Sequence, residues 1–276
     1  IYTEHRWLKK TVVRNKIDAV ISDNRFGMFH AEIPCIYITH QLSIKTGNRF
    51  TDRIAQKIHY RFINKFKECW VPDLKEEINL AGKLSHPVKF PHTPVKYIGP
   101  LSRFKKTDEE IKFDIAIILS GPEPQRTVFE NIILKDLQNC SGKVLLIRGL
   151  PENSAALPVT RPDVQIHNHL PAEELNKAIL QSALIISRAG YTTIMDLIKL
   201  QKKAILVPTP GQTEQEYLAA YLQQQKLFYY MLQEAFSIEG ALKIAGSFSL
   251  CENSIPQNTY EAQLESFVNT FNNTGT

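Results

Sequence analysis

Residues 184–221 read LIISRAGYTTIMDLIKLQKKAILVPTPGQTEQEYLAAY. Within this stretch, a short apolar run at 184–186 leads into Ser-Arg-Ala-Gly, a helical pattern follows at 192–200, and a second apolar run covers 204–207. Short runs rich in β-branched residues are typical of strands buried on both faces, and helices between such strands form βαβ units. The stretch therefore predicts a parallel sheet with helices packed against it.

The same alternation extends over the rest of the chain. We predict strands at residues 17–21, 35–39, 68–71, 96–98, 114–119, 143–147, 164–167, 184–186 and 204–207. We predict helices at residues 4–14, 52–66, 127–137, 172–181, 192–200, 214–225 and 260–271. The predicted fold class is therefore α/β, with parallel sheets in Rossmann-like layers.

The length and the charge distribution indicate two domains. The chain has 276 residues, and domains cluster near ~100–150 residues. Residues 1–110 carry a net charge of +8 and residues 111–276 a net charge of −3. A polar stretch opened by Gly-Pro separates them at 99–110, as is common between domains. We predict an N-terminal domain at 1–105 and a C-terminal domain at 106–276.

Composition and motifs exclude several classes of protein. With 43% hydrophobic and 22% charged residues, the chain has a globular composition, and its apolar runs are far shorter than the ~20 residues of a membrane-spanning helix. The cysteines stand singly, at Cys35, Cys69, Cys140 and Cys251, which favours a reducing, cytoplasmic setting. No DNA-binding motif or aromatic RNA platform accompanies the basic half, so we predict no nucleic-acid partner.

The predicted helix at 52–66 carries two adjacent stripes. Basic residues recur every fourth position, as do apolar ones: the first set is Arg53, Lys57, Arg61 and Lys65, and the second is Ile54, Ile58, Phe62 and Phe66. One interpretation is contact with an anionic lipid surface. The other is a core-packed amphipathic helix whose cationic edge meets water.

The turn after residue 186 has the features of a diphosphate site. Gly190 permits close approach of a ligand, and the helix beginning at Thr192 and Thr193 offers backbone N–H groups and hydroxyls to an anion. Arg188 can neutralise the remaining charge. Asp196 lies one helical turn after Thr192, where a carboxylate can accept both hydrogen bonds of a ribose diol.

The next helix begins with Gln212, Gln215 and Glu216, which we expect to bind sugar hydroxyls. Each feature also has an ordinary structural interpretation. Gly190 can be a simple turn, Thr192 a helix cap, and Asp196 a solvated acid in the first turn of a helix.

Residues 185–196 and 203–217 together resemble the C-terminal domain of glycosyltransferase family 28. The resemblance implies a GT-B fold of two Rossmann-like domains, with the donor bound mainly by the second. It also implies a metal-independent, inverting transfer of a hexosyl group, of the N-acetylglucosaminyl type, from a UDP-sugar, without a cofactor. A sugar or a lipid-linked molecule would be the acceptor, and the enzyme would be cytoplasmic or peripheral on the inner face of a membrane.

The resemblance assigns roles on the donor side. Asp196 matches an acid that holds the ribose, Gln215 and Glu216 match a pair facing the donor sugar, and Leu170 matches a position whose backbone reads uracil. The full donor set is Ser120, Gly121, Gln125, Arg126, Leu170, Arg188, Ala189, Gly190, Tyr191, Thr192, Thr193, Asp196, Gln212, Gln215 and Glu216.

One donor loop departs from the family pattern. Residues 120–126 read Ser-Gly-Pro-Glu-Pro-Gln-Arg, and the two prolines remove N–H donors that a Gly-rich loop would offer. Arg126 can supply a donor by its side chain, or it can be a helix-start arginine in solvent.

The N-terminal half of the chain departs further from the family pattern. A family Gly-rich loop with its histidine is absent, so we predict a truncated N-terminal domain. The loop at 39–43 aligns with an acceptor loop but lacks its glutamate. The general base is therefore unknown; Asp23 and His40 are weak candidates, with turn capping and a buried ring as their alternatives. The acceptor-side set is Asp23, Asn24, Arg25, His40 and Gln41.

Two rival functions remain open. The chain can be a nucleotide-sugar hydrolase or epimerase on the same scaffold. It can also be a non-catalytic donor-binding half that needs a companion chain.

Overall fold

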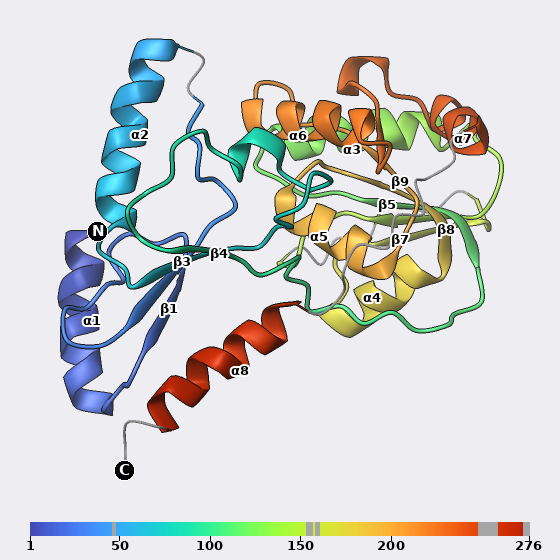
Figure 1. Cartoon of the computed structure of the whole chain (residues 1–276). Coiled ribbons are helices and arrows are strands. Elements are labelled where there is room, and N and C mark those ends of the chain that lie inside the picture. Colours follow the sequence, from blue (N-terminus) through green and yellow to red (C-terminus); the bar gives the residue numbers. More distant parts are fainter. Residues whose placement is uncertain (46–47, 153–156, 158–160, 248–258, 273–276) are drawn as a thin grey trace. The chain divides into compact units, whose positions relative to one another are not determined.

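The computed structural model describes residues 1–45, 48–152, 157, 161–247 and 259–272. The chain forms two compact units, each with its own parallel sheet (Figure 1). Unit 1 comprises the residues up to Leu101 and the last helix, α8 (Thr259–Asn272), and unit 2 begins at Ser102. The predicted boundary after residue 105 lies four residues from this division. The predicted C-terminal range 106–276 includes α8, which the structure groups with unit 1, where the GT-B resemblance places the last helix.

Unit 1 has a four-stranded sheet in the order β1-β2-β3-β4. The strands are β1 (Val20–Asp23), β2 (Cys35–Ile38), β3 (Glu68–Val71) and β4 (Val95–Tyr97). The other elements are the helices α1 (Tyr2–Asn15) and α2 (Arg49–Ile63) and the short turn η1 (Gly82–Leu84).

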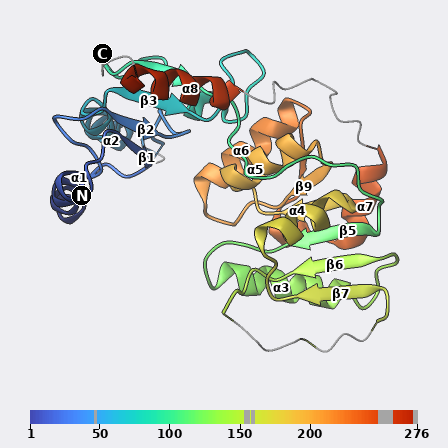
Figure 2. The ribbon, with the colours of Figure 1, turned by 90° about the horizontal axis from the view of Figure 1, so that it is seen from below.

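Alternation along the strands of unit 1 buries both faces of its sheet. Cys35 and Tyr37 of β2 pack with α1 and α2 residues on one face. Ile36, between them, packs on the other face with Trp70 and with Phe267 of α8. The rings of Trp70 and Phe267 meet edge to face, with centroids 5.5 Å apart, so α8 covers this face (Figure 2).

Unit 2 has a six-stranded sheet in the order β10-β9-β8-β5-β6-β7. The strands are β5 (Phe113–Ile118), β6 (Val144–Ile147), β7 (Val164–His167), β8 (Ser182–Ser187), β9 (Ala204–Leu206) and β10 (Tyr229–Tyr230). The helices are α3 (Gln125–Asp136), α4 (Ala172–Leu180), α5 (Tyr191–Leu200), α6 (Thr213–Gln224) and α7 (Ile238–Ser247), with the short turn η2 (Gln233–Ala235).

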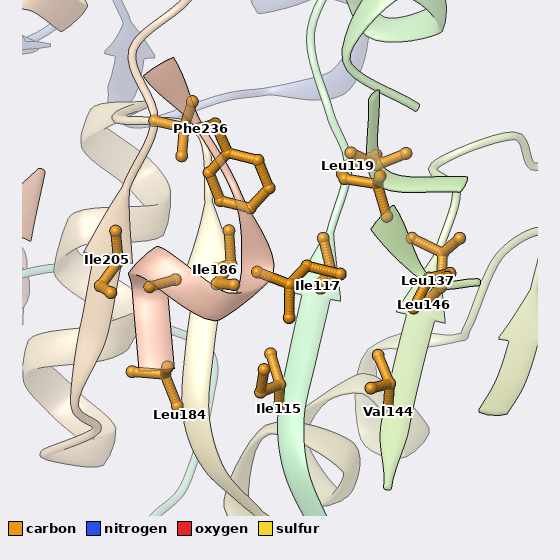
Figure 3. Close-up of a cluster of buried hydrophobic side chains, with 14 of the residues drawn as sticks. Ile115, Ile117, Leu119, Leu137, Val144, Leu146, Leu184, Ile186, Ile205 and Phe236 are labelled. Atoms are coloured by element: carbon orange, nitrogen blue, oxygen red, sulfur yellow. The ribbon is translucent and has the colours of Figure 1, made fainter. Parts of the chain in front are cut away.

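The core of unit 2 lies between the sheet and the helices α3 and α7. Ile117, Ile186 and Ile205 come from three neighbouring strands and point to this same face (Figure 3). Phe129 of α3 and Phe236 cover them and meet edge to face at 5.1 Å. The helices α4 and α5 lie on the opposite face of the sheet (Figure 1).

The strand order of unit 2 reverses between β5 and β8. From β5 the chain moves outward through β6 and β7, and it then returns to place β8 on the other side of β5. In open parallel sheets, ligands bind beyond the carboxyl ends of the strands at such a reversal. We therefore expect a ligand site at the loops that follow β5 and β8.

The predicted α/β class with parallel sheets is confirmed. The strand predicted at 17–21 begins later, at Val20. The helix α7 and the short strand β10 were missed.

Candidate functional site

Three loops of unit 2 meet at the carboxyl edge of its sheet. They follow β5, β8 and β9, whose parallel pairing places their ends side by side. Gly121, in the first loop, has a φ of +97°, which favours glycine, and a Cβ added there would lie 3.9 Å from the Thr209 hydroxyl of the third loop. The structure thus brings together loops about 90 residues apart in the sequence.

The second loop ends at the start of α5. Gly190 is the N-cap residue, in an extended conformation, and its carbonyl accepts the N–H of Ile194 at 3.0 Å. Among the described residues, no side chain caps this helix. Thr192 is exposed and Thr193 half-buried, whereas Ala189 and Tyr191 are buried. The helix start can therefore accept an anion at its backbone N–H groups.

Asp196 is half-buried one turn into α5. Its Oδ1 accepts a hydrogen bond from the Ser102 hydroxyl at 2.5 Å. Burial raises the pKa of the Asp196 carboxyl, while this hydrogen bond and the charge of Arg103 act in the opposite direction. Among the described residues, its second carboxylate oxygen has no hydrogen-bond partner, so a ligand hydroxyl can bind there or exchange with Ser102.

The loop after β9 is held by the helix that follows it. Gln215 Oε1 accepts the N–H of Thr209 at 2.9 Å, and its amide nitrogen donates to Gln212 Oε1 at 2.5 Å. Glu216 Oε1 accepts the N–H of Gly211 at 2.9 Å. These predicted sugar-binding side chains therefore shape their own loop, and each retains polar atoms for a ligand.

Arg188 is buried rather than directed into solvent. It is 1% exposed, and its guanidinium donates to the carbonyls of Val207 and Gln125 at 3.2 and 3.0 Å and to Gln233 Oε1 at 2.6 Å. It also stacks over the Phe129 ring, 4.4 Å from the centroid. Direct contact with a diphosphate would require this side chain to leave those partners.

Two buried hydroxyls at this edge have no hydrogen-bond partner among the described residues. They belong to Ser187, the last residue of β8, and to Thr209, and both side chains are at most 2% exposed. Buried polar atoms nearly always have a hydrogen-bond partner. Unpaired hydroxyls at the carboxyl edge of the sheet therefore mark a place where a ligand or water is expected.

Arg126 takes part in a buried ionic cluster. It is 6% exposed and donates to Glu123 and Glu130, and Glu130 also accepts from Arg148 Nε at 2.5 Å. Arg148 donates to Asn168 at 2.7 Å. The interpretation of Arg126 as a solvent-exposed arginine is therefore wrong, because α3 turns it toward Glu130 one helical turn away.

The remaining donor-side residues lie at the same edge. Ser120 and Gly121 are exposed in the loop after β5, and Gln125 begins α3. Leu170 is buried between β7 and α4. Their roles toward a ligand remain predictions.

The acceptor-side residues lie at the ends of β1 and β2, which are neighbours in unit 1. Asp23 is the exposed last residue of β1, and Asn24 accepts the Tyr37 hydroxyl at 2.8 Å. Arg25 forms an ion pair of 2.8 Å with Glu4. The structure thus gives Asn24 and Arg25 partners inside unit 1.

The loop that carries His40 and Gln41 is anchored to α2 and to η1. Its Gln41 carbonyl lies 2.9 Å from His59 Nε2, and the N–H groups of Leu42 and Ser43 both donate to the Leu84 carbonyl at 2.8 Å. His40 itself is half-buried. A fixed loop of this kind holds His40 and Gln41 at one place on the strand edge.

Sequence reasoning missed Ser102, Thr209 and Gln233. Thr209 lies within the stretch quoted first, and its place between two prolines at a strand end was a usable signal. Ser102 and Gln233 reach Asp196 and Arg188 from distant parts of the chain, and no local pattern marks them.

In the part of the chain that the structure describes, no group of three or more His, Cys, Asp and Glu side chains could hold a metal ion. No described helix is both long and apolar enough to span a bilayer. Metal independence stays a prediction.

Comparison with known proteins adds a family match and a fold match. Residues 133–262 match the model of the glycosyltransferase family 28 C-terminal domain. An uncharacterized glycosyltransferase of Methanosarcina acetivorans is 22% identical over 240 residues, which cover 79% of this chain and 61% of that protein. The chain thus spans about 61% of the length of this curated relative.

Solved structures share the fold at low sequence identity. The glycosyltransferase of kitacinnamycin matches with a TM-score of 0.63 and 14% identity, over 94% of this chain and 77% of its own. The MurG structure from Acinetobacter baumannii matches with a TM-score of 0.52 and 14% identity, over 94% and 74%. The fold is therefore of the GT-B type, as predicted.

Proposed function

We propose that this chain, whose residues 133–262 match the glycosyltransferase family 28 C-terminal domain, is a glycosyltransferase that uses a UDP-sugar. The group transferred would be a hexose of the N-acetylglucosaminyl type, and the acceptor a sugar or a lipid-linked molecule. One observation carries the proposal: the uncapped start of α5, the Asp196 carboxylate and the loop after β9 converge at the strand reversal of unit 2.

The residues of unit 2 would divide the donor between them. The α5 start, with Thr192 and Thr193, would hold the diphosphate and stabilise the charge that develops on it as the sugar leaves. Asp196 would accept the ribose hydroxyls, and Gln215 and Glu216 would bind the sugar. An acceptor hydroxyl would attack the anomeric carbon and invert its configuration, without a metal or cofactor.

On the acceptor side, the reaction needs a proton acceptor. An inverting transfer needs a general base within hydrogen-bond reach of the attacking hydroxyl. Asp23 and His40, at neighbouring strand ends, are the candidates in this chain. Each can be tested by substitution once an acceptor is known.

Asp196→Ala tests the donor site directly. Isothermal titration with UDP should show about 10- to 100-fold weaker binding, because hydrogen bonds to a charged group contribute ~1.5–3 kcal/mol. Glu239→Gln, which removes a negative charge from the exposed face of α7, is the matched control and should bind like the unmodified protein. Equal affinity of Asp196→Ala and the control would reject this role for Asp196.

Product analysis separates the transferase from its rivals. Incubation with a UDP-sugar and no acceptor would release free sugar from a hydrolase and a changed sugar from an epimerase, whereas a transferase would need an acceptor. A donor-binding half would bind UDP without turnover until a companion chain is added.

We also propose that α2 lies against an anionic membrane surface, at the cytoplasmic face. Ile54 and Ile58 are 47% and 52% exposed, and they lie beside the exposed basic residues Arg53 and Lys57. Exposed apolar and basic residues in this part of the helix favour lipid contact, whereas Phe62 is half-buried and Phe66, beyond the end of α2, is buried in the core of unit 1. Lys57→Glu should reduce sedimentation with vesicles containing phosphatidylserine, and Lys135→Glu, an exposed charge reversal on α3, should not. Equal sedimentation of the two variants would contradict the proposal.

A further inference from the structure

Arg188 introduces a positive charge into the interior of unit 2 without a carboxylate beside it. Its hydrogen-bond acceptors are all neutral: three backbone carbonyls, of Val207, Pro208 and Gln125, and the side-chain amide oxygen of Gln233. Its Nε is buried and has no partner among the described residues. A charged group at 1% exposure normally has an ionic partner.

The neutral setting of Arg188 changes its protonation equilibrium. Burial lowers the pKa of Arg188 to about 10, because the surroundings compensate its charge incompletely. The Arg126 cluster in the same unit is the contrast, since Glu130 is buried between its two arginines. Unit 2 therefore compensates one buried cationic site with a carboxylate and leaves the other with neutral dipoles.

Gln233 occupies the place where a counter-ion would be expected. Its Oε1 lies 2.6 Å from Arg188 Nη2, the shortest of the arginine's contacts, and its Nε2 donates to Gln125 Oε1 at 3.3 Å. Glutamate has nearly the same shape as glutamine and would form an ion pair at this distance. The amide keeps the guanidinium in position without neutralising it.

The uncompensated charge lies beneath the predicted diphosphate loop. Arg188 precedes Ala189 and Gly190, and its guanidinium contacts the backbone that leads into Thr209. The unpaired Ser187 and Thr209 hydroxyls lie at the same strand ends and independently indicate a ligand there.

We infer that Gln233 is a positioning residue that holds Arg188 without a protein counter-ion, so that the donor diphosphate supplies the missing negative charge. The inference rests on the proposed function and deepens it. The site would favour nucleoside diphosphates over nucleosides by long-range attraction through the loop, with no direct contact between Arg188 and phosphate.

Gln233→Glu tests this inference, because stability and ligand selectivity should change in different directions. The new carboxylate would pair with Arg188, so the melting temperature should stay equal or rise. Affinity for UDP should fall at least tenfold, and affinity for uridine should stay within twofold of the unmodified protein. Gln224→Glu, at the exposed end of α6, makes the same charge change as a control and should leave both affinities unchanged.

A second variant keeps the test decisive if Gln233→Glu folds poorly. Arg188→Gln removes the charge and keeps an amide donor, and it should lose the same preference for UDP over uridine while circular dichroism shows a folded chain. An unchanged UDP-to-uridine affinity ratio in a folded variant would overturn the inference about Gln233 but not the proposed function. Failure of the unmodified protein to bind UDP would overturn the proposed function, on which the inference depends.

Discussion

Removal of the Glu130 carboxylate should strongly destabilise unit 2. Glu130 is 4% exposed and lies between Arg126 and Arg148, which are 6% and 7% exposed. Its two oxygens accept three hydrogen bonds from these guanidinium groups, of 2.5, 3.1 and 3.4 Å. Glu130→Ala would leave two buried cations with no buried carboxylate between them.

The magnitude follows from the burial. Breaking a buried ion pair by removing one partner costs ~3–5 kcal/mol, mainly because the remaining charge stays desolvated. For a domain of this size, 1 kcal/mol corresponds to a change of ~2–4 °C in melting temperature. We therefore expect the melting temperature to fall by ~6–20 °C for Glu130→Ala. Glu130→Gln should give a smaller decrease, because its amide oxygen still accepts one hydrogen bond.

Thermal unfolding followed by circular dichroism measures this effect. Glu123→Gln is the matched control, because Glu123 also accepts from Arg126, at 2.6 Å, but is itself 54% exposed. Its removal should change the melting temperature far less. If Glu130→Ala and Glu123→Gln melted at the same temperature, the reasoning that buried arginines depend on Glu130 would be refuted.

Three further predictions concern other parts of the chain. Gly149 has a φ of +70°, and a Cβ added there would lie 2.4 Å from the Leu119 carbonyl oxygen. Gly149→Ala should therefore lower the free energy of unfolding by ~1–3 kcal/mol or more in a urea titration. An unchanged midpoint would show that the loop can move aside. Burial lowers the pKa of His59, so the unfolded chain takes up this proton at higher pH than the folded chain, and stability should fall as pH drops below ~6.5. Melting curves between pH 7 and 5 should show a shallower decline for His59→Gln, and parallel declines would count against a neutral buried ring. Phe267→Ala should cost ~3–5 kcal/mol and shift the fluorescence of Trp70, and a Trp70 spectrum identical to that of the unmodified protein would mean that α8 does not pack there.

The sequence was most informative where local pattern and packing agree. Central strands such as β5 and β8 are continuous apolar runs, and the helix α5 has a clear apolar face, so both were predicted within one or two residues. The helix α7 was missed because Gly240 and Gly246 weaken its intrinsic helix propensity. It forms because Ile238 and Ala241 are buried in the core of unit 2. A strand of two residues, like β10, is too short to show any period.

The candidate site also has features that the sequence predicts and features that it does not. The convergence of loops after parallel strands follows from the alternation of strands and helices, which sequence alone can suggest. The partners of the charged groups do not follow from it: Ser102 is 94 positions from Asp196, and Gln233 is 45 positions from Arg188. Burial decides whether an arginine faces a ligand or the interior, and burial depends on such distant contacts.

The return of α8 to the sheet of unit 1 has a consequence for how the chain folds as it is synthesised. Unit 2 is formed from one continuous stretch, so it can fold as soon as that stretch has left the ribosome. The face of unit 1 that carries Ile36 and Trp70 stays uncovered until Phe267 has been made, about 200 residues after Trp70. Residues 1–101 of unit 1 are therefore translated before unit 2 but completed after it, and truncation before α8 would leave an apolar surface open to aggregation.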